Sequence, residues 1–376
     1  MEATHDVIVA GGGVIGAAVA WRLGEQGERV LLLEREQMGQ GASAAAAGML
    51  GAQHETEEPG DFFQLCVQSR AMFPSLAAEL MEQTGVDIEL STQGTLRIAR
   101  GEEDVERLRA AGEWQRATGN RAVWLGPDEV AAREPALAPT RGALWLPDDV
   151  HVRAPRMAQA LARAARRHAR VAEGEAVLAY RVTGGAVEVT TTRGHHRASR
   201  LVLAAGAWTG TIAGDAAPPE AVGPVKGQLL CLRPDGAPAL RSTVAGGAVY
   251  LVPKTDGTVI VGATQEPEAG FAPQVTARAM GQLLGAALDV APALAGATVE
   301  RAWSGFRPTT PSKLPIIGPD AEHPEVLWAT GHHRNGILLA PVTAAMIVAA
   351  IRGEEVPSHW AAFAPAGRRE GTLGRA

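Results

Sequence analysis

An α/β fold with a second, α+β region is predicted by three features of this 376-residue sequence. The apolar run 7–10 leads into Gly11-x-Gly13-x-x-Gly16, and an apolar helical pattern over 17–23 follows. A second apolar run, 201–204, closes on small residues and indicates that the same sheet resumes late in the chain. Short strands predominate elsewhere, as in a mostly antiparallel sheet. Two closely connected domains are therefore expected.

The glycine motif is typical of a dinucleotide-binding turn in a Rossmann-like domain. Its first two glycines allow a tight turn and close approach of a pyrophosphate, and its third lets the helix pack on the strand. The free N–H groups of the helix then face the phosphates. A second strand, 30–33, ends in an acidic residue about 20 residues past the glycines, as the ribose-binding acid should. The contacts expected here are Gly11, Gly13, Val14, Ile15, Gly16, Glu34 and Arg35.

The segment 331–341, Gly-His-His-Arg-Asn-Gly-Ile-Leu-Leu-Ala-Pro, predicts a second contact with the cofactor. It lies between an apolar strand-like run, 326–329, and a helix-like run, 342–351, so a glycine-rich turn brings an arginine to the start of a helix. A second helix N-terminus indicates a cofactor that offers more than a nucleotide, and an isoalloxazine ring fits. The helix dipole would stabilise the negative charge that reduction places on that ring.

The remaining elements follow from hydrophobic periodicity and turn residues. Helices are expected over 69–84, 102–117, 156–170 and near 276–288, and strands over 95–99, 175–182, 186–191, 228–232, 249–252, 258–261 and 299–303. Residues 145–149 are interpreted as a turn, 214–224 as a Pro-rich linker, and the tail after Pro365 as disordered. The predicted nucleotide domain is discontinuous, over 1–85, 146–220 and 314–376, and the second domain comprises 86–145 and 221–313.

Composition excludes several classes of protein. The net charge is −6 and basic residues are dispersed, which argues against a nucleic-acid surface. The two cysteines, Cys66 and Cys231, lack partner spacing and indicate a reducing cytoplasm. The apolar run 337–351 is about 15 residues long and contains Pro341, too short to span a bilayer. No group of His, Cys or carboxylate residues has the spacing of a metal site.

These residues together resemble the glycine oxidase and D-amino-acid oxidase group of flavoproteins, and within it most closely the thiamine-biosynthetic glycine oxidases. The matching segments cover essentially the whole chain in the family's order; they are the glycine motif with Glu34, and the segments 38–50, 147–152, 225–227, 305–308 and 331–341. The resemblance implies an FAD-binding Rossmann-like domain and a substrate domain. The FAD should be non-covalent, because no cysteine lies between Arg307 and Gly318, where relatives in the sarcosine oxidase group attach their flavin.

The resemblance also assigns cofactor contacts beyond the glycine motif. Small residues in the loop 38–50 pass beside the flavin, where the backbone can donate to the ring edge, and Val177 matches a residue whose backbone meets adenine. The turn before the last helix supplies the rest. The implied contacts are Ala42, Ser43, Ala47, Gly48, Met49, Val177, His332, His333, Arg334, Asn335, Gly336, Ile337 and Leu338.

The substrate side depends on three residues. Arg307 matches the family's carboxylate-binding arginine, Arg334 a second arginine at the site, and Tyr250 a phenol that hydrogen-bonds the same carboxylate. The implied reaction is oxidative deamination of glycine by hydride transfer from Cα to flavin N5. The imine hydrolyses to glyoxylate and ammonia, and O₂ takes the electrons to give H₂O₂. No protein base is needed, because the amine lone pair drives hydride loss.

Other readings remain open at this level. Ala248 and Gln265 depart from the residues of some glycine oxidases near the pocket entrance, so glycine, sarcosine and small D-amino acids are all candidate substrates. A quinone-linked D-amino-acid dehydrogenase of the same fold is one alternative, and a non-catalytic flavin-binding subunit is another. Relatives imply a homo-oligomer, with a tetramer among the options, and transfer of the imine to a thiazole synthase.

Overall fold

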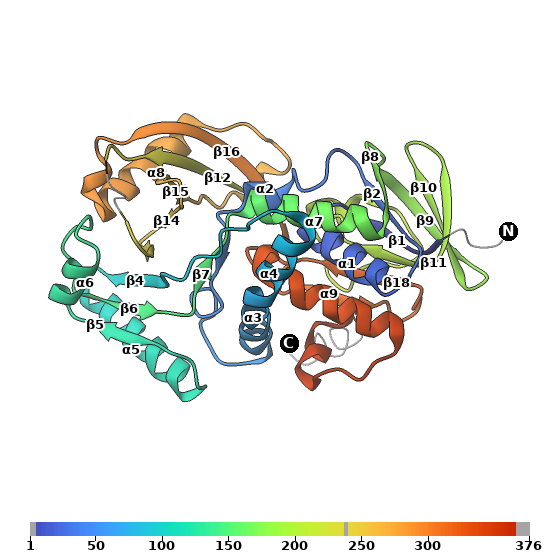
Figure 1. The fold of residues 1–376 in the computed structure, drawn as a ribbon, viewed down its shortest axis with the longest axis horizontal. Coiled ribbons are helices and arrows are strands. Elements are labelled where there is room, and N and C mark those ends of the chain that lie inside the picture. Colours follow the sequence, from blue (N-terminus) through green and yellow to red (C-terminus); the bar gives the residue numbers. More distant parts are fainter. Residues whose placement is uncertain (1–4, 237–239, 366–376) are drawn as a thin grey trace.

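The computed structural model describes residues 5–236 and 240–365, and two large β-sheets organise them. In Figure 1 the first sheet lies on the right, beside the long helices α1, α7 and α9, and the second lies on the left. Helices α2, α3 and α4 lie between these two halves in that view. The tail after Pro365, expected to be disordered, lies outside the described residues.

The first sheet has eight strands in the order β17-β18-β11-β1-β2-β8, and β9 and β10 extend from β11. Its centre is parallel, because β1 pairs in parallel with both β2 and β11, as a Rossmann-like domain requires. The strands are β1 (His5–Ala10), β2 (Val30–Glu34), β8 (Arg170–Glu173), β9 (Val177–Thr183), β10 (Ala186–Thr191), β11 (His195–Leu203), β17 (Ile316–Pro319) and β18 (Val326–Thr330).

Three helices cover this sheet and form the largest hydrophobic core. Helix α1 (Val14–Glu25) packs against both α7 (Ala154–His168) and α9 (Gly336–Arg352), which explains why nearly all its apolar residues are buried. Alanines at 17, 18 and 20 let these helices approach closely, and Trp21 fills the space between them at 0% exposure. The start of α9 is thereby fixed beside the start of α1.

The second sheet also has eight strands, in the order β16-β12-β15-β14-β13-β4-β6-β5. All neighbouring pairs are antiparallel except β13 with β4, so the predicted mostly antiparallel sheet is confirmed. The strands are β4 (Thr95–Ala99), β5 (Val123–Leu125), β6 (Gly142–Leu146), β12 (Gly223–Arg233), β13 (Thr243–Gly246), β14 (Val249–Pro253), β15 (Val259–Gly262) and β16 (Thr298–Thr309).

Shorter elements complete the two halves. Helix α8 packs on β12, β14 and β15, and α5 and α6 pack on β6. The remaining elements are α2 (Ala42–Ala45), α3 (Asp61–Ala71), α4 (Phe73–Thr84), α5 (Glu102–Ala117), α6 (Pro127–Arg133), α8 (Ala277–Val290), β3 (Met49–Leu50), β7 (Val150–His151) and the 3₁₀ turns η1 (Gly206–Thr211), η2 (Pro267–Ala269), η3 (Pro292–Leu294) and η4 (Ser358–Phe363).

The single helix expected over 69–84 is wrong, since two helices, α3 and α4, cover this region and meet at Met72. The N–H of Met72 donates to Ser69 O at 3.1 Å and ends α3. Pro74 then lies in the first turn of α4, where its missing N–H leaves no hydrogen bond unmade. The apolar periodicity continues across the break, which is why the pattern concealed it.

The helix expected over 156–170 starts at Ala154 and ends at His168, and Arg170 begins strand β8 instead. This strand pairs in parallel with β2 and was missed, because Arg-Val-Ala-Glu is short and lies half-buried at the edge of the sheet. The turn expected at 145–149 is also too long, because Trp145 and Leu146 belong to β6.

The last helix and the last long strand both extend beyond their predicted ranges. Helix α9 begins at Gly336, not at 342, and accommodates Pro341 because the surrounding packing outweighs the local cost. Strand β16 continues from 303 to Thr309, and Arg307 lies within it, opposite Val225. The linker expected over 214–224 ends earlier, where β12 begins at Gly223.

The domain boundaries stay a prediction, and the sheet membership of the strands supports them. Strands of the first sheet lie within the ranges expected for the nucleotide domain. Strands of the second sheet lie in the other ranges, except that β6 crosses the predicted boundary by one residue, Leu146.

Candidate active site

A cavity of about 730 Å³ is lined by residues from both sheets. Its wall is formed by the glycine turn, the small-residue loop, the turn before α9 and the substrate residues. These segments are far apart in the sequence. The predicted site residues that line it are Gly11, Gly13, Val14, Ile15, Glu34, Arg35, Ala42, Ser43, Ala47, Gly48, Met49, Val177, Tyr250, Arg307, His332, His333, Arg334, Asn335, Gly336 and Ile337.

Two predicted cofactor residues, Gly16 and Leu338, do not line the cavity. A Cβ at Gly16 would lie 1.9 Å from the carbonyl oxygen of Gly11, so this glycine permits the contact between helix and strand, as expected for the third glycine. Leu338 is 1% exposed within α9, and its carbonyl accepts from the Ser69 hydroxyl at 2.6 Å. Any contact of Leu338 with the cofactor would therefore come from its backbone N–H.

The glycine turn has the backbone geometry that a pyrophosphate site needs. Gly11 has φ +109°, a conformation that favours glycine, and its N–H donates to Leu33 O at 2.8 Å. Ser43 Oγ accepts from the N–H of Val14 at 3.0 Å and ties the small-residue loop to the start of α1. That loop contains the short helix α2 followed by β3.

Glu34 is held at the end of β2 by two backbone N–H groups. Its Oε2 accepts from Gly12 N at 2.7 Å, and its Oε1 accepts from Glu36 N at 2.9 Å. The carboxylate is thus fixed beside the glycine turn and lines the cavity, as a ribose contact requires. The adjacent guanidinium of Arg35 stacks over the ring of Trp208 at 3.7 Å.

The start of α9 presents a second helix N-terminus to the cavity. Gly336 and Ile337 line it, and the first N–H groups of a helix have no partner within the helix. His332 is buried, with Nε2 2.9 Å from Thr343 Oγ1, and burial lowers its pKa to about 3. His333 has a left-handed backbone, φ 47°, and its N–H donates to Pro308 O at 2.7 Å.

Arg307 and Tyr250 lie on two strands of the second sheet and interact directly at the other end of the cavity. Two glycines make room for them: a Cβ at Gly227 would lie 2.4 Å from Arg307 Nη1, and one at Gly262 would lie 2.5 Å from the Tyr250 hydroxyl. Nη1 of Arg307 donates to Thr264 O at 3.0 Å, which orients the guanidinium.

Burial raises the pKa of the Tyr250 hydroxyl, and Arg307 and Arg334 partly counter this shift. The phenol is therefore protonated at neutral pH and can donate a hydrogen bond.

Ala248 and Gln265, expected near the pocket entrance, are exposed and do not line the cavity. Gln265 follows Thr264, the residue whose carbonyl orients Arg307.

Arg334 has a partner that sequence reasoning missed. Its Nη2 donates to Glu55 Oε1 at 3.0 Å, and Glu55 also lines the cavity, with 11% of its side chain exposed. Glu55 lies in a short loop, 52–56, directly after the small-residue segment. The sequence offered one signal, an acidic residue that could pair with an arginine of the site. It did not show that the partner is Arg334, because the two residues are far apart in the sequence.

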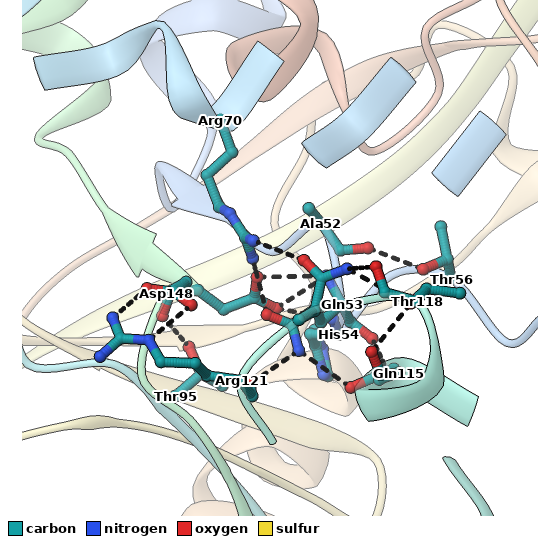
Figure 2. A network of polar contacts seen from close by, with 12 residues as sticks. Ala52, Gln53, His54, Thr56, Arg70, Thr95, Gln115, Thr118, Arg121 and Asp148 are labelled. Atoms are coloured by element: carbon teal, nitrogen blue, oxygen red, sulfur yellow. Dashed lines mark hydrogen bonds and ion pairs between the residues drawn. The ribbon is translucent and has the colours of Figure 1, made fainter. Parts of the chain in front are cut away.

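A buried polar network holds the loop that carries Glu55 (Figure 2). Both oxygens of Asp149, which is 0% exposed, accept from the N–H of Gln53, and Oδ2 also accepts from the N–H of His54 at 2.7 Å. Arg70 forms an ion pair with the same carboxylate, and its Nη1 donates to Gln53 Oε1 at 2.9 Å. Gln53 Nε2 in turn donates to Gln115 Oε1 at 3.1 Å.

Aromatic side chains from both halves meet at the edge of the cavity. Trp208 in η1 stacks on Phe271, which follows η2, with ring centroids 4.8 Å apart. Phe306 of β16 contacts both rings edge-on at 5.9 and 5.6 Å. All three side chains line the cavity. The second half of the molecule therefore reaches across to the first beside the predicted nucleotide end.

The residues present fit the predicted FAD. The cavity begins at a glycine turn with a fixed carboxylate, continues past small residues at 42–49 and the start of α9, and ends at Arg307, which is partly buried, and Arg334, which is exposed. Such a sequence of contacts suits a dinucleotide joined to a ring that gains negative charge on reduction. Among the described residues, no cluster of His, Cys and acidic side chains could hold a metal ion.

Comparison with known proteins agrees with this geometry. The family described as FAD dependent oxidoreductase matches residues 6–350. Glycine oxidase of Geobacillus kaustophilus is 38% identical over 96% of this chain and 97% of its own length. Its crystal structure superposes with a TM-score of 0.92 at 37% identity, over 96% of this chain and 98% of that chain.

A longer relative also matches. The bifunctional protein ThiO/ThiG of Synechocystis is 35% identical over 97% of this chain, which spans 54% of that protein. Within residues 5–236 and 240–365, no helix has the length and apolar character needed to cross a membrane. The match over nearly the whole chain, together with the cavity described above, shows that the protein belongs to the FAD-dependent oxidoreductase family.

Proposed function

We propose that this protein is an FAD-dependent amino-acid oxidase that acts on glycine. The balanced reaction is glycine + O₂ + H₂O → glyoxylate + NH₃ + H₂O₂. The observation that carries the proposal is the meeting of Arg307, Tyr250 and Arg334 at one end of a cavity that fits FAD. The similarity to glycine oxidases over nearly the whole chain supports the choice of substrate.

Arg307 and Tyr250 would bind the substrate carboxylate. The guanidinium offers donors in a planar fork that matches a carboxylate, and the Tyr250 hydroxyl can add a further donor. Since Thr264 O already fixes one nitrogen of Arg307, the carboxylate is bound in a defined orientation. This orientation determines which of the two Cα–H bonds of glycine points into the cavity.

Arg334 would set the charge around the carboxylate. It is paired with Glu55, so the two arginines and this carboxylate together carry one net positive charge, which suits a substrate with one carboxylate. Burial lowers the pKa of His333 to about 4 and that of His332 to about 3, so both imidazoles are neutral at pH 7. Neither places a further positive charge beside the substrate amine.

FAD, when bound, would supply the acceptor for the two electrons of the Cα–H bond and the means of their transfer to O₂. The chain contributes orientation and charge: the N-terminus of α9 places a positive dipole end at the cavity, where negative charge on the cofactor would be stabilised. The aromatic contact of Trp208 with Phe271 would limit access of water to the cofactor.

We further propose that the imine product is passed to a thiazole synthase. The support is the relative named bifunctional protein ThiO/ThiG, of which this chain matches about half. Sarcosine and small D-amino acids are proposed as weaker substrates. A homo-oligomer and a cytoplasmic location stay predictions; both described cysteines are free and buried, which is compatible with a reducing compartment.

Anaerobic mixing of the purified holoenzyme with glycine tests the proposal. Bleaching of the flavin absorbance, followed by release of H₂O₂ when air is readmitted, supports the oxidase. Bleaching that a quinone reverses and air does not would instead identify a dehydrogenase. If glycine, sarcosine and D-alanine all fail to bleach the flavin, the proposed function is wrong.

A further inference from the structure

Lys254, at the end of strand β14, is a buried lysine that the proposed reaction does not use. It is 6% exposed, and its Nζ donates to Ala47 O at 2.8 Å and to Val152 O at 2.9 Å. Burial of an ammonium group is unfavourable unless hydrogen bonds compensate for lost hydration, so these two bonds define the position of the side chain. They connect the second sheet with the small-residue loop of the first half.

Ala47 belongs to the wall of the cofactor cavity, since residues 45–49 all line it. Val152 supports the same wall, because its N–H donates to Gly48 O at 2.9 Å. Gly48 has φ +86°, and a Cβ there would lie 2.1 Å from Val152 O. Lys254 thus bridges the carbonyls of Ala47 and Val152 and holds the cavity wall from the side of β14.

Lys254 directly follows strand β14, which carries Tyr250. The two hydrogen bonds of Lys254 therefore link the cofactor wall with the substrate end. The turn that follows is docked by charged groups. Arg153, at the start of α7, donates to Glu89 at 2.8 Å and forms an ion pair with Asp256 at 2.9 Å, and the Thr255 hydroxyl donates to Glu89. The end of β14 is therefore held on both sides of Lys254.

We propose that Lys254 is a positioning residue for the isoalloxazine ring: its ammonium holds the Ala47–Met49 backbone in the conformation that receives the flavin and ties it to the strand that carries Tyr250. The inference rests on the FAD site of the proposed function. It concerns flavin binding and not glycine turnover, so the two can fail separately.

A pH dependence distinguishes this role from simple packing. Burial, together with the nearby charge of Arg153, lowers the pKa of Lys254 to about 7, and Glu89, Asp256 and Cys231 partly counter this shift. A neutral amine makes weaker hydrogen bonds than an ammonium. The affinity for FAD should therefore fall as pH rises through about 7.

Four titratable groups around Lys254 have shifted pKa values that lie outside this range. The pKa of His151 lies well below its usual value through burial and the charge of Lys254, and that of Asp256 is about 2 because of hydrogen bonds from Thr258 and Arg153, which outweigh its burial. The pKa of Arg153 is raised by Glu89 and Asp256 despite its burial, and burial raises that of the Cys231 thiol. A difference between wild type and a Lys254 variant over pH 6–8.5 thus reports Lys254.

The test is the dissociation constant of FAD, measured at pH 6 to 8.5 by diluting the holoenzyme and following released flavin fluorescence. Lys254→Met should raise the constant about tenfold at pH 6 and remove most of its pH dependence. Lys254→Arg keeps a permanent positive charge, so it should retain affinity and also lose the pH dependence. Lys226→Met is the matched control, because Lys226 is similarly buried but donates to Gln274 O, away from this wall.

Lys226→Met is expected to lower stability while its FAD constant follows the pH dependence of wild type. A Lys254→Met protein with unchanged FAD affinity and unchanged pH dependence would overturn the proposal and leave Lys254 with a packing role alone. If Lys254→Met does not fold, Lys254→Arg decides, because a pH dependence like that of wild type in this variant would also overturn it.

Discussion

At the nucleotide end of the cavity the contacts come mainly from one stretch, residues 11–49, whereas the substrate end is assembled from β14, β16, the loop 52–56 and the turn before α9. The first end depends on backbone geometry, as the close contact of Gly16 with Gly11 illustrates. The second depends on side chains held by other side chains, as Arg334 is by Glu55. Changes at the two ends should therefore have separable consequences for cofactor and substrate.

The largest effect is expected from Gly16→Ala. The new Cβ would lie 1.9 Å from a backbone oxygen, so helix α1 and the glycine turn must separate. We expect loss of bound FAD, measured as the flavin-to-protein absorbance ratio, and a lower unfolding temperature. Gly281→Ala in α8 is the matched control, since a Cβ there would have no neighbouring atom within 4 Å. Retention of full FAD by Gly16→Ala would contradict this account of the nucleotide end.

Arg307→Ala should affect only the substrate end. Loss of two charge-assisted hydrogen bonds of about 1.5–3 kcal/mol each predicts a fall in kcat/KM for glycine of roughly 10²–10⁴-fold. The FAD content should stay that of wild type. Arg301→Ala, on the same strand but exposed, serves as control in the peroxide assay. Loss of flavin from Arg307→Ala would show that this arginine supports the cofactor instead.

A smaller effect is expected from Asp149→Asn, which touches neither cofactor nor substrate. Removing this charge loosens the N–H contacts of Gln53 and His54 and leaves Arg70 without its ion pair. Because misplacement of a positioning group weakens substrate binding, we expect the KM for glycine to rise about tenfold with FAD retained.

The matched control for Asp149→Asn is Arg121→Ala, which breaks the neighbouring, exposed pair with Asp148 (Figure 2). Surface pairs of this kind contribute little, so its KM should equal that of wild type. If Asp149→Asn left KM unchanged while lowering stability, the network would support the fold and not Glu55.

The smallest effect is expected from Phe271→Ala, which removes the stacking on Trp208 between the two halves. Such an aromatic pair contributes about 0.5–1.5 kcal/mol, so FAD should dissociate roughly 2–10-fold faster in a dilution experiment. Phe62→Ala breaks a comparable pair with Phe363 and should leave the FAD rate unchanged, because neither ring lines the cavity. Equal rates for the two variants would exclude a role of this contact in cofactor retention.

The same contrast explains how much the sequence could predict. The nucleotide end was predictable because strand, glycines, helix and acidic residue follow one another, and each has a local signature. Tyr250 and Arg307 were assigned through family resemblance, and the structure places both at one cavity. Glu55 and Lys254 were missed, because their partners lie far away in sequence and no local pattern encodes those contacts.

Element boundaries failed where tertiary packing overrides local pattern. The expected helical run began at 342, after Pro341, but burial against α1 and α3 accommodates this proline within α9. Strand β8 carries almost no apolar signal, and it exists because β2 provides a parallel partner at the edge of the sheet. The break at Met72 lies inside a continuous apolar stripe, so periodicity could not locate it.

The most direct test of the substrate end is a titration of the oxidised holoenzyme with acetate, a carboxylate without an amine, followed by flavin absorbance. The account predicts a saturable spectral change that glycine competes for under anaerobic conditions. Acetate should bind at least about tenfold more weakly to Arg307→Ala, as loss of charge-assisted hydrogen bonds requires, and normally to Arg301→Ala. Equal acetate affinity in wild type and Arg307→Ala would contradict the central claim that Arg307 binds the substrate carboxylate.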